Sequence, residues 1–350
     1  MRGDYASTAD KGEVSQFGAL TAALAGTLGV GNVASVALAI SIGGPGAVFW
    51  VTATGFFGMS LKFCECALAV KYRRIGVDGV VNGGPMHYLP LAFAKIGLRP
   101  LGLGAAVFFS VATLLASTSL FQVNQAFVEV RAVTGLQSPL LFGLLFALLV
   151  GAVIVGGMKG IARVCTRLVP AMVLVYFIAT GTVLVAKAAA LPAVFAAILH
   201  GAFSPTAFGG GVLGAFVVGV QRAVFAGESG LGSSAIAHAA AKTDEPISEG
   251  LVALFEPLLA TVVVCNLTAL VILAAGAPIP AGKAGGVEIA SAAFQPCYRG
   301  SLRPSPCWSR CSPIRRPSPG LITASGLGVG CLGKGPSGGQ VSGSSSSALW

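Results

Sequence analysis

Residues 26–32 read GTLGVGN and stand in the middle of an apolar run that extends from residue 17 to residue 42. A second apolar run, residues 211–241, is interrupted in the same way by AGESGLG at residues 226–232. Each glycine in a helix interior costs roughly 1 kcal/mol relative to alanine, so three clustered glycines weaken a helix at its middle. Inside a membrane, the backbone groups freed by such a break must face protein or a water-filled cavity. Two interrupted helices in corresponding positions indicate the binding site of a carrier.

The composition of the chain supports a membrane setting for these breaks. Of 350 residues, 55% are hydrophobic and only 10% are charged, whereas about 25% of the residues of a soluble domain are charged. The formal net charge is +10, but the cations stand at the ends of apolar runs and near the carboxyl end, without the aromatic-basic pattern of a nucleic-acid surface. We therefore interpret them as signals of membrane topology, and no nucleic-acid partner is expected. The eight cysteines lack zinc or disulfide-framework spacing.

Membrane-spanning helices need about 20 mostly apolar residues each. The chain has seven such runs, which predict an all-α integral membrane protein with helices at 17–42, 46–70, 102–127, 139–157, 168–191, 211–241 and 251–276. The breaks fall in the first and the sixth, a spacing that fits two inverted repeats of five helices. A shorter run, 192–200, predicts an interfacial helix. Residues 277–296 are expected to be a loop, and residues 297–350, rich in Pro, Ser, Gly and Arg, are expected to be disordered.

Positive charges in the connections predict an orientation. Lysine and arginine are frequent in residues 71–101 and 158–167 and scarce in residues 128–138. Because positively charged loops stay on the cytoplasmic side, the amino-terminal segment 1–14 is expected to be cytoplasmic. The chain is thus predicted to be a multi-pass protein of the cell membrane.

The residues at the breaks suit a small zwitterionic ligand. Backbone carbonyls around Gly26 and Gly29 would hold a cation if the helix is unwound there, and the N–H groups of the following half-helix would hold a carboxylate. Asn32 is uncharged and both donates and accepts. The same glycines also fit the alternative of close helix packing. Glu228 is expected either to cap the half-helix that follows it or to belong to a cation site.

Other polar residues have plainer interpretations. Gln122 and Asn124 are expected either to bond between helices or to line a substrate path. Lys62 and Glu65, three residues apart, predict a local ion pair. The three histidines, His87, His200 and His238, are placed near loops or helix ends, with no second ligand spaced for a metal and no expected catalytic role.

Two other classes of function remain open from the residues alone. One is an ion channel. The other is an intramembrane serine protease, because residues 227–230 match the Gly-x-Ser-Gly of rhomboid-type enzymes. That chemistry needs a histidine from another helix beside Ser229, and the sequence predicts none at that depth. The expected class is therefore a carrier and not an enzyme.

Many blocks of the chain, taken in order, resemble the alanine or glycine:cation symporter family. The resemblance covers about residues 12–294, and its blocks are residues 26–34, 43–50, 57–65, 70–73, 83–88, 156–162, 168–170, 222–233 and 239–243. It implies a leucine-transporter-type fold of two inverted five-helix repeats, and symport of alanine or glycine with sodium. Sodium would be a co-transported ion, with no cofactor. Lipid, sodium and the amino acid are the expected partners, and the resemblance assigns no oligomeric state.

The resemblance also implies site residues. The family's substrate positions fall here on Thr27, Gly31, Asn32, Gln122, Phe225, Ala226 and Gly227. A cation is expected at Gly26, Gly29 and Glu228.

The chain departs from the family in three ways. The family has a membrane helix before the first break, whereas this chain starts in the loop that follows it, so a truncation is expected at this end too. The family reads Gly, Ser-Asn and Ala where this chain has Ala223, Ala226-Gly227 and Ser229, and losing a hydroxyl and an amide there predicts an altered substrate choice. The family also continues with three or more helices after Gly276. Since the match stops near Phe294, we expect a truncated or frameshifted gene whose second repeat is incomplete.

Overall fold

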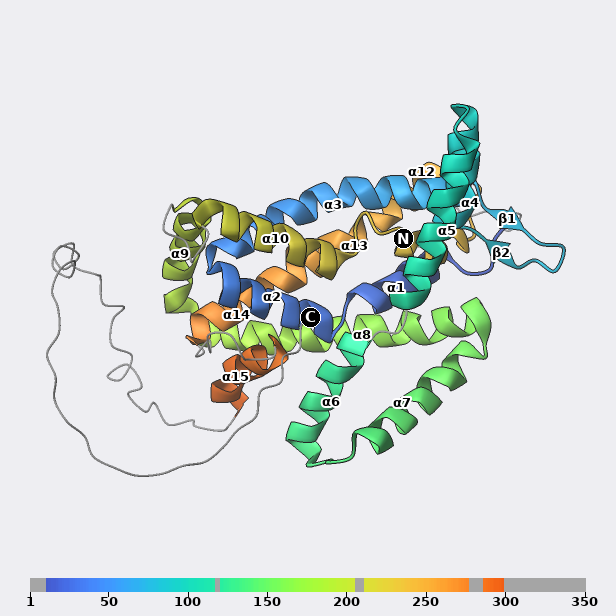
Figure 1. The fold of residues 1–350 in the computed structure, drawn as a ribbon. Coiled ribbons are helices and arrows are strands. Elements are labelled where there is room, and N and C mark those ends of the chain that lie inside the picture. Colours follow the sequence, from blue (N-terminus) through green and yellow to red (C-terminus); the bar gives the residue numbers. More distant parts are fainter. Residues whose placement is uncertain (1–10, 117–119, 205–210, 277–285, 299–350) are drawn as a thin grey trace, which may run out of the picture. The chain divides into compact units, whose positions relative to one another are not determined.

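The chain folds into helices joined by short connections. A computed structural model describes residues 11–116, 120–204, 211–276 and 286–298, and Figure 1 shows their arrangement. In these residues, the only strands are β1 (Arg74–Ile75) and β2 (Val81–Asn82), which form a small antiparallel hairpin. The all-α expectation is confirmed.

The first broken helix consists of α1 (Gln16–Thr27) and α2 (Val30–Gly43). Ser15 caps α1, because its Oγ accepts a hydrogen bond of 3.1 Å from the backbone N–H of Gly18. The axes of the two halves differ by 43°. The glycines at 26–32 therefore interrupt the helix where the sequence predicts.

The second broken helix consists of α10 (Gly211–Gly227) and α11 (Ser233–Ala239). Three residues of the connection adopt positive φ, namely Glu228 at 48°, Gly230 at 89° and Gly232 at 74°. Glycine adopts this conformation without steric cost, so Gly230 and Gly232 permit the turn that separates the two half-helices.

The long helix α3 (Gly46–Lys71) packs against both halves of this second broken helix and against α12 (Pro246–Ala253) (Figure 1). At its start α3 also meets α9 (Leu191–Phe203) so closely that a Cβ at Gly46 would lie 2.1 Å from the carbonyl carbon of Gly201. After α3 and the β hairpin, α4 (Pro85–Lys95) and α5 (Arg99–Ala116) pack against each other.

Three further helices follow, α6 (Leu120–Thr134), α7 (Pro139–Ile154) and α8 (Gly157–Ala186), and α8 leads into α9 through a 3₁₀ turn at Ala188–Ala190. The last long helical stretch, Pro246–Ala275, is composed of α12 (Pro246–Ala253), α13 (Phe255–Pro257), a π-helical segment (Leu258–Cys265) and α14 (Asn266–Ala275). It is followed by α15 (Gly286–Tyr298).

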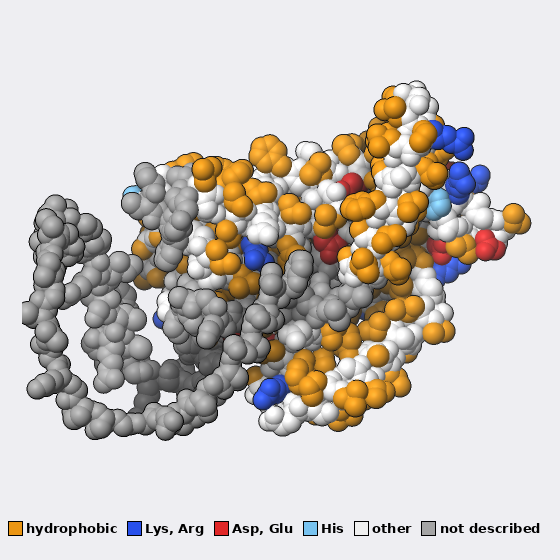
Figure 2. All heavy atoms as spheres, viewed as in Figure 1, with side chains coloured by type: hydrophobic (Ala, Val, Ile, Leu, Met, Phe, Trp, Pro, Cys, Tyr) orange, Lys and Arg blue, Asp and Glu red, His pale blue; other side chains and the backbone are white. Residues whose placement is uncertain are grey.

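The main apolar core lies where these helices converge. It gathers buried residues from α2, α3, α8, α9, α10, α14 and α15, among them Val36, Val51, Val183, Ile198, Ala226, Ile272 and Ile289. In contrast, α7 has no buried residue, and Leu140, Leu144 and Leu148 on it are 62–76% exposed. Figure 2 shows hydrophobic side chains over much of the described part of the visible face. Such surfaces suit contact with lipid.

Four helical stretches among the described residues are long and apolar enough to cross a membrane: Gly46–Lys71, Arg99–Ala116, Gly157–Ala186 and Pro246–Ala275. The number rises to six if each bent pair is one span, namely the first broken helix and Gln122–Thr134 with Pro139–Ile154. The sequence predicts about seven. The predicted span 211–241 accounts for most of the difference. The apolar part of α10, Leu213–Gly227, is too short to count as a membrane span by itself.

Some predicted boundaries are wrong. The run 102–127 falls on α5 and α6, and residues 117–119 between them lie outside the described part of the chain. The expected loop 158–167 belongs to α8. Lys159 and Arg163 have long side chains that can extend their charges to water from within a helix, so these charges do not end it. From residue 286 on, the expected loop 277–296 belongs to α15, whose residues Val287, Ile289, Ala290 and Ala293 are buried. The expected disorder of residues 297–350 lies, from residue 299 on, outside the described residues. The run 192–200 is a helix, α9, as predicted.

The amino-terminal segment joins the outer ends of both broken helices. Val14 forms a parallel bridge with Ala241, and the side chain of Gln16 donates to Ser248 over 3.0 Å. Arg73 holds the same junction from the end of α3. Its guanidinium donates at 2.6–2.8 Å to the backbone carbonyls of Ala239, Ala241, Lys11 and Thr243.

Candidate substrate and cation pocket

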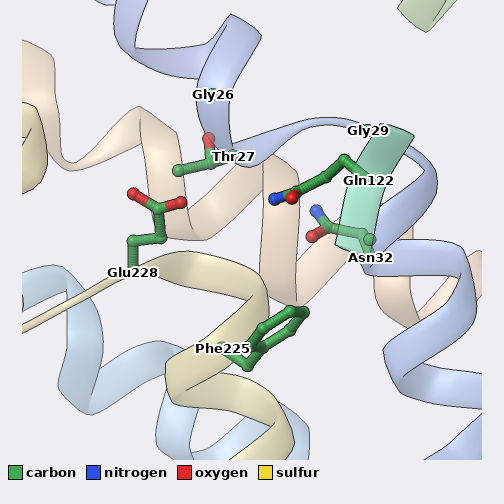
Figure 3. A pocket seen from close by; sticks show the side chains of 8 residues that line it. Gly26, Thr27, Gly29, Asn32, Gln122, Phe225 and Glu228 are labelled. Carbon is green, nitrogen blue, oxygen red and sulfur yellow. The ribbon is translucent and has the colours of Figure 1, made fainter. Parts of the chain in front are cut away.

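The two helix breaks meet around one pocket, shown in Figure 3. Its empty volume is about 230 Å³, including the part that opens outward. The lining comes from the end of α1, the start of α2, α6 and the end of α10: Gly26, Thr27, Gly29, Gly31, Asn32, Gln122, Phe225 and Glu228. The fold thus brings together residues that are far apart in the sequence.

Asn32 places an unused donor in this pocket. The residue is 2% exposed, and Nδ2 has no hydrogen-bond partner among the described residues. Figure 3 shows the amides of Asn32 and Gln122 pointing toward the space between Thr27 and Phe225. A buried donor without a partner costs about 1–3 kcal/mol, so an acceptor bound here would remove that cost.

Glu228 lies at the other side of the pocket, directly after α10 ends. Its carboxylate extends toward Thr27 in Figure 3, and its Oε2 accepts a 2.6 Å hydrogen bond from Ser233 Oγ. The backbone of Glu228 is in the left-handed region, φ 48°, which costs a residue with a side chain roughly 1–2 kcal/mol. The carboxylate is therefore held at the pocket by α11 and by a strained turn.

The two ends of the first broken helix that face each other across the break, the end of α1 and the start of α2, also meet at the pocket. The last carbonyls of an α-helix and its first N–H groups lack partners within the helix. The end of α1 and the start of α2 present such groups to the pocket, although the N–H of Asn32 donates to the carbonyl of Gly29 over 3.1 Å. The helix dipoles place partial negative charge at the end of α1 and partial positive charge at the start of α2. A cation is favoured near the end of α1 and Glu228, and a carboxylate near the start of α2 and Asn32.

The glycines at the break leave room in the pocket. A Cβ on Gly26 or Gly29 would meet no atom within 4 Å. On Gly31 it would lie 3.8 Å from the ring of Phe225 and 3.9 Å from Gln122 Cγ. Thr27 is 4% exposed, and its hydroxyl donates to the carbonyl of Ala23 at 3.4 Å.

Eight of the ten site residues predicted from the sequence line this pocket, and two do not. Ala226 is 1% exposed and packs in the main apolar core. A Cβ on Gly227 would lie 2.6 Å from Thr261 Oγ1, so this residue faces the last long helical stretch. Asn124 is exposed on α6 and does not line the pocket. The binding roles of all these residues stay predictions.

The expected local pair of Lys62 with Glu65 is replaced by contacts between helices. Lys62 Nζ lies 3.1 Å from Glu256 Oε2, and it also donates to Ser234 Oγ. Glu65 lies near the backbone of Gly230 and Gly232 in the second break. Side chains three apart on a helix stay neighbours, but partners on α11 and α13 are closer here.

The sequence places His238 near a loop or helix end, but the structure places it in the interior. It is fully buried, and its ring contacts Glu249 and Glu256. Its position close to the end of α11 gave no signal of this. The serine protease alternative gains no support from the geometry, since both ring nitrogens of His238 face carboxylates, while Ser229 Oγ lies 3.5 Å from the carbonyl of Gly227. Among the described residues, no group of three or more His, Cys, Asp or Glu is placed to hold a metal ion.

Known proteins resemble the chain over most of its length. The model of a family described as the sodium:alanine symporter family matches residues 1–303. The sodium/alanine symporter AgcS of Methanococcus maripaludis is 39% identical over 267 residues, which is 76% of this chain and 59% of that protein. An uncharacterized transporter of Haemophilus influenzae is 38% identical over 76% of this chain and 59% of its own length. The amino-acid carrier protein AlsT of Bacillus subtilis is 32% identical over 80% of this chain and 59% of its own length.

The chain therefore spans about three-fifths of the length of these relatives. The match to the family model extends past both broken helices and through α15, so it includes every element that builds the pocket. By this match and by its identity with AgcS, the chain belongs to the sodium:alanine symporter family.

Proposed function

We propose that the pocket binds alanine, glycine or a similar small neutral amino acid together with sodium, and that the protein moves both across the cell membrane in the same direction. The observation that carries this proposal is the buried Asn32 Nδ2, which has no partner in the described part of the chain and faces the pocket at the start of α2. A substrate carboxylate would accept from it and from N–H groups at the start of α2.

Charge balance supports a neutral zwitterion with a monovalent cation. The pocket offers one carboxylate, Glu228, and the carbonyl end of α1, opposite the donors of Asn32 and α2. Sodium and the substrate ammonium group would both be favoured on the carboxylate side. Phe225 and Gln122 narrow the space beside Gly31, which favours a small side chain.

Coupling to sodium gives enough free energy for accumulation. A membrane potential of 100 mV contributes about 2.3 kcal/mol per charge moved, and a tenfold sodium gradient adds about 1.4 kcal/mol. Together, about 3.7 kcal/mol would sustain roughly a 500-fold gradient of alanine. Alternating access would occur by movement of one bundle around the fixed pocket. The lysines and arginines of residues 71–101 support a cytoplasmic amino terminus.

Equilibrium binding of radiolabelled alanine to the purified full chain in detergent tests the proposal. We expect saturable binding in sodium chloride that is lost when choline replaces sodium. N32A should weaken binding about fivefold or more, since an unpartnered donor is worth about 1–3 kcal/mol. N124A, a change of the same chemistry at an exposed position on α6, is the matched control. Binding that ignored sodium, or equal effects of both variants, would contradict the proposal.

Transport itself is tested in sealed vesicles. A carrier shows saturable counterflow of labelled alanine driven by an imposed sodium gradient. The channel alternative predicts single-channel currents and no counterflow.

A further inference from the structure

A cluster of ionisable side chains is buried away from the pocket. We call Lys62 on α3, His238 on α11, Glu249 on α12 and Glu256 on α13 the buried cluster, and all four are fully buried at 0% exposure. His238 Nδ1 lies 2.6 Å from Glu249 Oε1, and Nε2 lies 2.5 Å from Glu256 Oε1. Burying charges is costly unless they are paired and hydrogen-bonded. The proposed symport assigns this cluster no role.

The two short contacts of His238 fix the number of protons between these groups. A neutral imidazole has one N–H and one acceptor nitrogen, and an ionised carboxylate only accepts. Each ring nitrogen faces a carboxylate oxygen, so with both glutamates ionised the two contacts are hydrogen bonds only if both nitrogens carry protons. Lys62 and Ser234 also donate to Glu256, which favours its ionised form. The imidazolium and Lys62 then balance the two glutamates, and the cluster is neutral.

The cluster has a second unusual feature. Glu249 Oε2 is buried and has no partner among the described residues. With one oxygen unsatisfied, Glu249 depends on its short bond to His238 for stabilisation of its charge. A buried carboxylate held by one partner is sensitive to the charge on that partner.

Other titratable groups surround the cluster. On α3, Glu65 and Cys66 lie close enough to the buried cluster to interact with its charges. Tyr88 on α4 packs against Ala235 and Ala239 of α11, and Arg73 donates to the carbonyl of Ala239. The segments α1, β2 and Leu258–Cys265, which also pack nearby, carry no charged residue.

We propose that His238, Glu249 and Glu256 form a buried proton-binding site whose occupancy keeps the half-helix α11 docked against α3 and the last helical stretch. With the proton bound, His238 bridges two carboxylates on α12 and α13. When the proton leaves to water, the imidazolium becomes neutral imidazole and the cluster changes from neutral to a single negative charge. One of the two N···O contacts then joins two acceptors and becomes repulsive.

The site is linked to the pocket through α11. Ser233, the first residue of α11, donates to Glu228 at the pocket, and His238 lies on the same short helix. A change that releases α11 therefore removes the donor that holds the pocket carboxylate. By linkage, a ligand that fixes Glu228 would in turn favour proton binding at His238.

Nuclear magnetic resonance of the full chain labelled with ¹⁵N-histidine tests the proton site without any requirement for transport. The chain has only three histidines, and H87Q and H200Q assign the other two. At about pH 7.5, roughly one unit above the ordinary imidazole pKa of about 6.5, both ring nitrogens of His238 should carry protons. A His238 ring with a single N–H at this pH would overturn the proposal.

The variant E249Q removes one negative charge while keeping a side chain of the same shape. We expect His238 to lose one ring proton at about pH 7.5 in E249Q, and the amides of residues 233–239 to exchange faster with deuterium. E245Q, at an exposed position on the preceding turn, is the matched control and should change neither signal. If E249Q left His238 doubly protonated and α11 equally protected, the link between this proton and the docking of α11 would be wrong.

Discussion

The hydroxyl of Ser233 donates a 2.6 Å hydrogen bond to Glu228 Oε2, across the turn that separates α10 from α11. The bond joins a residue that lines the pocket to one that does not. A hydrogen bond to a charged group contributes about 1.5–3 kcal/mol. The position of the pocket carboxylate thus depends on a neighbour outside the pocket.

S233A should raise the sodium concentration needed for half-maximal alanine binding by about tenfold or more, because a loss of 1.4 kcal/mol or more corresponds to that factor. Titration of alanine binding with sodium measures this. S110A on α5, where Ser110 donates only to the carbonyl of Ala106, is the control. Equal sodium dependence in both variants would show that Ser233 does not position Glu228.

E228Q should abolish the sodium dependence of alanine binding while the protein stays folded. Glutamine keeps the length of the side chain and an oxygen that accepts from Ser233, but it lacks the charge that favours a cation. The measurement is alanine binding in sodium against choline, with thermal unfolding as the check on folding. Retained sodium dependence would place the cation elsewhere.

G31A should weaken binding of alanine without unfolding the protein. The added Cβ would lie 3.8 Å from Phe225 and 3.9 Å from Gln122, which is ordinary contact, so the methyl group occupies pocket space rather than forcing helices apart. G104A is the control, because a Cβ there meets nothing within 4 Å. Both variants should unfold at or slightly above the parent temperature, since alanine favours helix by about 1 kcal/mol. Only G31A should lose affinity.

G46A should destabilise the protein strongly. Its Cβ would lie 2.1 Å from the carbonyl carbon of Gly201, so α3 and α9 must move apart, at a cost of about 1–3 kcal/mol or more. Thermal unfolding in detergent measures the effect. G143A on α7, where a Cβ meets no atom within 4 Å, should unfold like the parent chain.

R73A should destabilise the junction of the two broken helices by about 3 kcal/mol or more, because four backbone carbonyls lose a charged donor at once. R73K should recover little of this, since one ammonium cannot reproduce the planar fork of a guanidinium. R74A, at the exposed neighbouring position, is the control. Similar unfolding temperatures for R73A and R74A would contradict this role of Arg73.

The breaks and the pocket were the part of the fold that local sequence could predict. Clustered glycines act on the helix that contains them, so residues 26–32 and 226–232 mark both interruptions within the sequence itself. Asn32, Gln122 and Glu228 were selected as polar residues in apolar surroundings or from the family resemblance, and all three line the pocket. Ala226 and Gly227 do not line the pocket, because each adjoins it in sequence but faces other helices.

The buried cluster could not be predicted from spacing. Lys62 has an acidic neighbour three residues away, and this spacing predicts a local pair. The residue that it pairs with is instead Glu256 on α13. His238 comes near the end of a seven-residue helix, where a histidine is ordinarily exposed. Only the packing of α3, α11, α12 and α13 brings these residues together. The helix α15 was missed for a related reason, because its burial depends on α2 rather than on a long apolar run of its own.

The pairing of the amino-terminal segment with residues beyond α11 has a consequence for biosynthesis. Gln16 bonds to Ser248, which is 232 residues away in the sequence. At about 5–20 residues per second, a ribosome needs roughly 10–50 s to synthesise the chain between them. During that time α1 is already made, but its outer end has no partner, and the pocket that it helps to line cannot close. The helix α1 is therefore synthesised long before it reaches its final contacts.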